Sequence, residues 1–216
     1  ILNLPFFDHQ SLASEEKCLN SVFFFSFFML NLVFYTNNNN TQIDLNIYIS
    51  MNIIVMKFGG TSVAGTEKLR NIADIVIKEV KNNKIIVVLS AMAGETNKLQ
   101  SYLDDFGSQY SLESDLVLTS GEQVTIGLLS AELKNKGIKS IPFLGWQIPI
   151  ITDESHEKAK ILHIDKKRIE KFFEKYDVIV LAGFQGISLD GEITSLGRGG
   201  SDTTAVAIAS SVGAER

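Results

Sequence analysis

Two basic side chains in this sequence stand close to glycines, a combination suited to binding small anions. Lys57 precedes Gly59 and Gly60 in the run KFGGTS, and Arg198 is flanked by glycines in the run TSLGRGGSDTT. Glycines let the backbone approach an anion and present N–H groups to it, and a guanidinium can hold a carboxylate through two parallel hydrogen bonds. These residue types favour recognition of phosphate and carboxylate groups.

Two acidic residues accompany these cations, and each has a structural alternative. Glu122 follows Gly121 in an apolar helical region, where it is either a solvated surface residue or the anchor for a substrate ammonium. Asp202 stands where a helix should begin, so it is either the helix N-cap or part of an anion site beside Arg198. For Lys57 the structural alternative is a side chain that extends along the rim of a sheet into solvent.

A third loop, SAMAGETN at residues 90–97, offers small residues and hydroxyl groups suited to a ligand carboxylate. Its alternative is an ordinary turn from a strand into a helix, with Thr96 or Asn97 as the helix cap. The Gly-Gly turn after Lys57 matches neither the phosphate-binding pattern GxxxxGK[ST] nor the dinucleotide pattern GxGxxG. No single motif therefore defines the chemistry.

The elements that position these loops alternate between strands and helices. Short apolar runs, typical of buried parallel strands, predict strands at residues 53–58, 84–90, 138–144 and 177–182. Apolar residues at helical spacing predict helices from about residue 66 and over 164–175. A largely helical region is expected over 113–136, and a helix of small residues from about 201 to 212. Pro142 would place its strand near an edge or a bulge, and Asp190-Gly191 predicts a hairpin turn.

This order predicts an α/β fold, a three-layer αβα sandwich with a mainly parallel sheet. In such sheets ligands bind beyond the carboxyl ends of the strands. The loops that carry Lys57, Glu122, Arg198 and Asp202 should therefore meet at one edge of the sheet.

Composition excludes several other functions. Twenty Lys and Arg against 25 Asp and Glu give a net charge of −5, so no basic surplus is present for binding nucleic acid. One cysteine, Cys18, allows no internal disulfide, and three scattered histidines provide no structural zinc site. We expect a packed core in a reducing compartment.

Residues 1–50 differ in composition from the remainder and hold eight of the 14 phenylalanines but only five charged residues. The uncharged stretch 19–35 resembles a signal-peptide core or a short membrane span. It is short for a span, interrupted by Ser26 and Asn31, and preceded by Glu15 and Glu16, so membrane targeting is disfavoured. We favour a product that starts at Met51, with 1–50 as a Phe- and Asn-rich leader outside the fold and 51–216 as one domain.

Taken in order, the motifs resemble those of aspartokinase, a member of the amino acid kinase superfamily. They are KFGGTSV at 57–63, SAMAGETN at 90–97, Gly121-Glu122, GFQG at 183–186 and TSLGRGGSDTTA at 194–205. The resemblance covers essentially residues 51–216, and the last motif is highly specific. The set differs from the motifs of the uridylate, glutamate and acetylglutamate kinases, which share the fold.

The resemblance implies an activity: ATP-dependent phosphorylation of the β-carboxylate of L-aspartate to 4-phospho-L-aspartate, the first step toward lysine, threonine and methionine. It further implies Mg²⁺ held mainly by the nucleotide phosphates rather than by protein ligands. A cytoplasmic enzyme that forms homo-oligomers in its full-length form is implied as well.

Roles for individual residues also follow from the resemblance. Lys57 would bridge the β-carboxylate and the transferring phosphoryl group, and Asp202 would orient Lys57 or the Mg²⁺ environment. Arg198 would hold the α-carboxylate, and Glu122 would pair with the α-amino group. The phosphates would contact Lys57, Gly59, Gly60 and Thr61, and the substrate pocket would be completed by Thr96, Gly199, Gly200 and Ser201.

Two departures from the family pattern modify this expectation. Glu95 stands where the family more often has an apolar residue, and its charge would weaken aspartate binding. The family continues beyond the position of Arg216 into segments that bind most of the nucleotide. We therefore expect weak or no activity from residues 51–216 alone. The alternative function is a catalytically inactive remnant that retains only aspartate binding.

Overall fold

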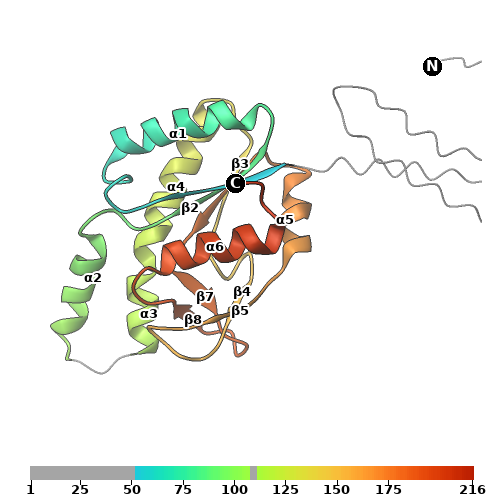
Figure 1. The fold of residues 1–216 in the computed structure, drawn as a ribbon. Helices are drawn as coiled ribbons and strands as arrows, with labels where there is room; N and C mark the ends of the chain where they lie inside the picture. Colours follow the sequence, from blue (N-terminus) through green and yellow to red (C-terminus); the bar gives the residue numbers. More distant parts are fainter. Residues whose placement is uncertain (1–51, 108–110) are drawn as a thin grey trace, which may run out of the picture. The chain divides into compact units, whose positions relative to one another are not determined.

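The computed structural model describes residues 52–107 and 111–216 (Figure 1). The uncharged stretch 19–35 and Cys18 lie outside the described residues. The helices are α1 (Thr66–Val80), α2 (Glu95–Asp104), α3 (Leu112–Leu118), α4 (Ser120–Asn135), α5 (Lys166–Phe173) and α6 (Gly200–Val212). The strands are β1 (Ile53–Phe58), β2 (Lys84–Leu89), β3 (Ser140–Phe143), β4 (Ile150–Thr152), β5 (Ile161–Ile164), β6 (Val178–Ala182), β7 (Gln185–Ile187) and β8 (Ile193–Ser195).

The main sheet aligns the ends of the strands that precede the candidate loops. Within the described residues it has four parallel strands in the order β1-β2-β6-β3. Phe58 at the end of β1 lies opposite Leu89 of β2, which lies opposite Ala182 of β6. The loops after these three strands therefore begin side by side.

Helices cover both faces of the main sheet, and the side chains of each strand alternate between two cores. Ile85 and Val87 of β2 pack in the same core as residues of α1 and α4. Ile86 and Val88 pack in a second core with residues of α5 and α6 (Figure 1). Full burial of such a side chain contributes about 1.5–3 kcal/mol, which explains the continuous apolar run of β2. The predicted three-layer αβα sandwich is confirmed.

A second, smaller sheet was not predicted. Its strand order in the described residues is β5-β4-β7-β8, with β4 and β5 antiparallel and β7 and β8 antiparallel. The hairpin predicted at Asp190-Gly191 connects β7 to β8, and Gly191 has a φ of 87° there. Strands of three or four residues, such as β4 and β5, are too short to produce a recognisable alternating pattern.

Several predicted boundaries change in the structure. The largely helical region expected over residues 113–136 consists of two helices, because the chain breaks at Thr119, whose hydroxyl donates to the carbonyl oxygen of Asp115 at 2.7 Å. The first turn of α5 is stabilised by Asp165, whose carboxylate accepts from the N–H of Arg168 at 3.1 Å. The strand containing Pro142 lies at the edge of the main sheet in the described residues, as predicted.

Across the described residues, no helix has both the length and the apolar character that a bilayer crossing requires.

Candidate functional site

A cavity of about 350 Å³ lies at the carboxyl ends of the main strands, and we refer to it as the strand-end cavity. Its walls come from the loops after β1 and β2, from α4, from the segment after β6, and from the first turn of α6 with the glycines before it. The volume falls within the range of roughly 300–1,000 Å³ that is common for small-molecule sites. The predicted convergence of separate loops on one edge of the sheet is therefore present in the structure.

An ion pair crosses one wall of this cavity. The Lys57 Nζ atom lies 2.7 Å from Oδ1 of Asp202, and the two side chains are 27% and 68% exposed. The N-cap of α6 is Gly199, and no side chain caps this helix. The interpretation of Asp202 as the N-cap is therefore wrong: its carboxylate instead holds the lysine ammonium at the cavity.

Glu122 is buried in the first turn of α4 and lines the cavity, with 3% of its surface exposed. Its Oε1 atom accepts from the N–H of Ala91 at 2.9 Å, whereas Oε2 has no hydrogen-bond partner. Burial raises the pKa of Glu122 from 4.5 to about 7, although the bond from Ala91 acts in the opposite direction. The alternative of a solvated surface residue is therefore wrong.

Arg198 stands on a glycine turn at the cavity wall. Gly197 and Gly199 have φ angles of 72° and 78°, which side-chain-bearing residues rarely adopt. The N–H of Gly200 donates to the carbonyl oxygen of Gly197 at 2.9 Å, which closes the turn. Arg198 is exposed and lines the cavity, where its guanidinium is accessible to an anion.

The predicted site residues divide into those that line the cavity and two that do not. Those lining it are Lys57, Gly60, Thr96, Glu122, Arg198, Gly199, Gly200, Ser201 and Asp202. Gly59 belongs to a turn in which its carbonyl oxygen accepts from Ser62 at 2.8 Å, and it does not line the cavity. Thr61 is exposed outside the cavity.

The β1 and β2 loops touch each other through Gly60. A Cβ atom at Gly60 would lie 2.9 Å from the carbonyl oxygen of Ala91, so only glycine fits there without displacement of the backbone. Ala93 donates its N–H to the carbonyl oxygen of Gly60 at 3.0 Å. This close approach places the Lys57 loop beside the loop that contacts Glu122.

The helix-cap alternatives for the loop that contains Glu95 are wrong, whereas the expected effect of Glu95 on aspartate binding stays a prediction. Glu95 does not line the cavity, and its carboxylate lies 3.4 Å from the Nζ atom of Lys98 on the same helix. Helix α2 has Gly94 as its N-cap with no side-chain cap bond, so neither Thr96 nor Asn97 caps it.

Phe184 also lines the cavity, although the sequence pattern indicated no role for its side chain. It has a φ of 70°, unusual for a residue with a side chain, and its N–H donates to Thr204 Oγ1 at 3.1 Å. A Cβ atom at Gly200 would lie 2.9 Å from Phe184 Cδ2, so the ring packs on the start of α6. The two glycines of the GFQG motif were a signal that the backbone is unusual here.

Within residues 52–107 and 111–216, no group of three or more His, Cys, Asp and Glu side chains is arranged to hold a metal ion.

Comparison with known proteins identifies similar sequences and folds. The model of the amino acid kinase family matches residues 52–216. An aspartokinase of Geobacillus stearothermophilus is 46% identical over 168 residues, which are 77% of this chain and 41% of that protein. The chain therefore spans about two fifths of the length of this curated relative.

Two solved structures give the same picture of the fold. The aspartate kinase from Synechocystis superimposes with a TM-score of 0.64 at 37% identity, over 76% of this chain and 27% of that one. Aspartokinase III of E. coli, solved in complex with aspartate and ADP, has a TM-score of 0.64 at 23% identity over 76% of this chain and 48% of that one.

Proposed function

The chain belongs to the amino acid kinase family. We propose that it functions as an aspartate kinase and binds L-aspartate in the strand-end cavity. Such an enzyme transfers the γ-phosphoryl group of ATP to the β-carboxylate of L-aspartate and yields 4-phospho-L-aspartate. The similarity to proteins named aspartokinase or aspartate kinase supports this choice over other kinases of the family.

The charges around the cavity carry the proposal. L-Aspartate has one ammonium group and two carboxylates, and the cavity wall offers one buried carboxylate and two cations. The unpartnered Oε2 of Glu122 would accept a hydrogen bond from the substrate ammonium, which offsets the cost of burying that oxygen. Arg198 would hold the α-carboxylate, and Lys57 would then face the β-carboxylate.

In the transfer step, an oxygen of the substrate β-carboxylate attacks the γ-phosphorus of ATP. The bond from that phosphorus to the oxygen bridging the β- and γ-phosphates breaks, and ADP leaves with the electron pair. No general base is needed, because a carboxyl group with an ordinary pKa of about 4 is already ionised at neutral pH. Lys57 neutralises charge as the two anions meet, and Asp202, 2.7 Å away, fixes the position of its ammonium.

Mg²⁺ fits this site as an ion carried by the nucleotide. The cavity wall offers Asp202 as a carboxylate near Lys57, so the phosphate oxygens would supply most ligands. When bound, the ion neutralises phosphate charge. Lys57 and Gly60, which line the cavity, would contact the phosphates, and we propose the same for Gly59 and Thr61 of that turn.

A second candidate is a protein that binds L-aspartate without turning it over. The residues proposed for the ammonium and the α-carboxylate, Glu122 and Arg198, both line the cavity. By contrast, two of the residues proposed for the phosphates, Gly59 and Thr61, do not. This difference favours retention of aspartate binding over retention of phosphoryl transfer.

We further propose that residues 51–216 form the amino acid kinase catalytic domain and that 1–50 are a leader that is not part of this fold. The family match, which begins at residue 52, supports this boundary. We also propose a cytoplasmic location, assembly with further copies of the chain, and a place at the start of lysine, threonine and methionine synthesis.

The direct test is ADP release by the full chain with Mg-ATP, measured with and without L-aspartate. We expect at most weak release, in line with the low activity expected of residues 51–216 alone, and this release should depend on aspartate and disappear in Lys57→Ala. Lys136→Ala is the matched control, because Lys136 also forms an ion pair, with Asp74 at 2.9 Å, but lies outside the cavity. Binding without release would establish the second candidate, and the absence of both from folded protein would overturn both.

A further inference from the structure

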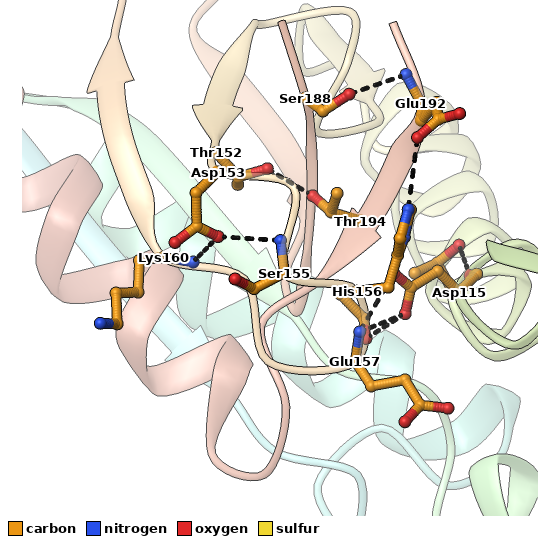
Figure 2. Close-up of polar contacts among 12 residues, drawn as sticks. Asp115, Thr152, Asp153, Ser155, His156, Glu157, Lys160, Ser188, Glu192 and Thr194 are labelled. Carbon is orange, nitrogen blue, oxygen red and sulfur yellow. Dashed lines mark hydrogen bonds and ion pairs between the residues drawn. The ribbon is translucent and has the colours of Figure 1, made fainter. Parts of the chain in front are cut away.

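Asp115, in α3, is a fully buried carboxylate that does not line the strand-end cavity. Its Oδ1 atom accepts from the Ser195 hydroxyl at 2.5 Å, and its Oδ2 atom lies 2.9 Å from Nδ1 of His156. The N–H of Glu157 lies 3.1 Å and 3.2 Å from these two oxygens (Figure 2). A buried carboxylate is tolerated only when it is paired in this way.

All of these partners belong to the segments that flank the Arg198 turn. Ser195 ends β8, directly before Leu196 and Gly197. His156 and Glu157 belong to the segment 153–160 between β4 and β5, which we call the β4–β5 loop. This loop joins β8 directly, because the N–H of Ala159 donates to the carbonyl oxygen of Ser195 at 2.9 Å.

The β4–β5 loop also packs directly against the glycine that precedes Arg198. A Cβ atom at Gly197 would lie 2.8 Å from the carbonyl oxygen of Glu157, so the two backbones are in contact. Asp115 binds the N–H of Glu157, and the carbonyl oxygen of the same residue packs on Gly197. One residue therefore separates the buried carboxylate from the turn that carries Arg198.

The backbone conformation of Glu157 at this contact must be stabilised by neighbouring residues. Glu157 has a φ of 63° and Gly197 a φ of 72°, both in the left-handed region. A residue with a side chain stays in that region only when its surroundings hold it there. The Glu157 side chain points away from Asp115 in Figure 2, so its backbone makes the contact.

We propose that Asp115 is a positioning residue for the substrate site, which acts through Glu157 and Ser195 to set the place of the Gly197-Arg198 turn. The inference rests on the proposed function for the identity of the ligand that Arg198 holds. Its mechanical part, the coupling of Asp115 to the turn, does not depend on that function.

Hydrogen exchange measured by mass spectrometry on the full chain without ligand tests the mechanical part. We expect Asp115→Asn to speed exchange in the β4–β5 loop and also in residues 196–200. His156→Gln, at a side chain that is 15% exposed, should act in the same direction and decides the question if Asp115→Asn does not fold.

Asp153→Asn is the matched control. The Asp153 carboxylate accepts from the N–H groups of Ser155 and Lys160 in the same loop, at 3.2 Å and 3.0 Å. Neither bond reaches α3, and the Asn Oδ1 atom can still accept from both N–H groups. Any change in exchange should therefore stay within the β4–β5 loop and leave residues 196–200 unchanged. Unchanged exchange at 196–200 in both Asp115→Asn and His156→Gln would overturn the proposal.

Calorimetric titration with L-aspartate tests the link to the site. We expect Asp115→Asn to weaken binding about 10-fold or more, because a small misplacement of a positioning group has effects of this order. In an Arg198→Lys background, which keeps the charge but loses the guanidinium fork, the same change should have little further effect.

Equal losses of affinity in both backgrounds would show that Asp115 does not act through Arg198 and would overturn the proposal. A folded wild-type chain that does not bind aspartate would refute the proposed ligand instead. In that event the exchange at residues 196–200 still decides whether Asp115 positions the turn.

Discussion

Glu122 has a carboxyl group that is almost completely buried and satisfied at one oxygen only. Because burial raises its pKa to about 7, the folded chain holds this proton at pH values where the unfolded chain, with a pKa near 4.5, has released it. Glu122 therefore stabilises the fold most below pH 4.5, and that contribution is lost as the pH rises to about 7. Burial thus favours the protonated form of Glu122, whereas a ligand ammonium would favour the ionised carboxylate.

We predict that the affinity for L-aspartate increases with pH up to about 7 and then levels off. Below pH 7 the ligand must displace the proton of Glu122, so affinity should fall about 10-fold for each pH unit. Glu122→Gln should bind aspartate about 10- to 100-fold more weakly, with this pH dependence removed.

Calorimetry between pH 5.5 and 8 measures both effects. Glu132→Gln is the control on the same helix, since its carboxylate lies 3.6 Å from the Lys136 ammonium and outside the cavity. Wild-type affinity in Glu122→Gln would contradict the assigned role.

For the individual side chains, the sequence predicted which of them converge but not how they pair. Lys57, Glu122 and Arg198 follow strands or begin helices at one sheet edge, so their proximity follows from the parallel order. The ion pair between Lys57 and Asp202 depends on where α6 begins, and Gly199 rather than Asp202 occupies the N-cap. Such details depend on backbone positions that periodicity does not determine.

At the element scale, the contact between β6 and α6 places Ser201 and Asp202 at the cavity. A Cβ atom at Gly183, just after β6, would lie 2.7 Å from the Cβ atom of Ser201. We predict that Gly183→Ala lowers the free energy of unfolding by about 1–3 kcal/mol, because the helix start must move away. Urea unfolding measures this change.

Gly127→Ala is the matched control for that substitution. Gly127 lies inside α4, and a Cβ atom there would meet no atom within 4 Å. The free energy of unfolding should rise by about 0.5–1 kcal/mol, because alanine favours the helix. Equal stability of the two variants would show that β6 and α6 are not in close contact.

The strength of the contact between α3 and the β4–β5 loop should depend on pH, because His156 forms part of it. Its ring lies between two carboxylates, Asp115 of α3 at 2.9 Å and Glu192 of the β7–β8 turn at 3.3 Å (Figure 2). The hydrogen bond with Asp115 raises the pKa of His156 above its usual 6.5, with a smaller effect from Glu192. The contribution of charged His156 to the stability of the fold is therefore complete below about pH 6.5, and it is lost as the pH rises through the higher pKa that His156 has in the folded chain.

We predict that wild type exceeds His156→Gln in stability most at pH 6 and that the difference narrows toward pH 9. Urea unfolding across this range measures the difference. His163→Gln is the control, because His163 on β5 is exposed and has no carboxylate partner among the described residues. A difference that does not vary with pH would contradict the role given to the charged imidazole.

Elements with long apolar runs were the predictable ones. The β1 strand and the start of α1 match their predictions, and β2 and β6 match within one residue at each end. The α2 helix, with no buried residue, was weighed only as an alternative for its loop, and the short strands β4 and β5 were missed. Their positions are set by tertiary contacts, such as the 2.6 Å hydrogen bond between Thr152 and Thr194, which connect distant parts of the sequence.

In the molecule as a whole, the main sheet holds the strand ends at the cavity in place, because a hydrophobic core packs on each of its faces. Both faces of β2 and β6 are buried, so the ends of these strands cannot shift without disturbing either core. The smaller sheet, through β8 and the β4–β5 loop, supports the Arg198 turn from the other side. Loops that follow strands of both sheets thus contribute to the site, and the sequence predicted one of these sheets.

We propose that the strand-end cavity recognises L-aspartate by its three charges. Calorimetric titration of the full chain with L-aspartate, succinate and β-alanine tests it most directly, since succinate lacks the ammonium and β-alanine lacks the α-carboxylate. We predict binding of L-aspartate and at least about 10-fold weaker binding of each analogue, because each leaves Glu122 or Arg198 unpaired. Equal affinity for all three compounds, or no binding of L-aspartate by the folded chain, would contradict the claim.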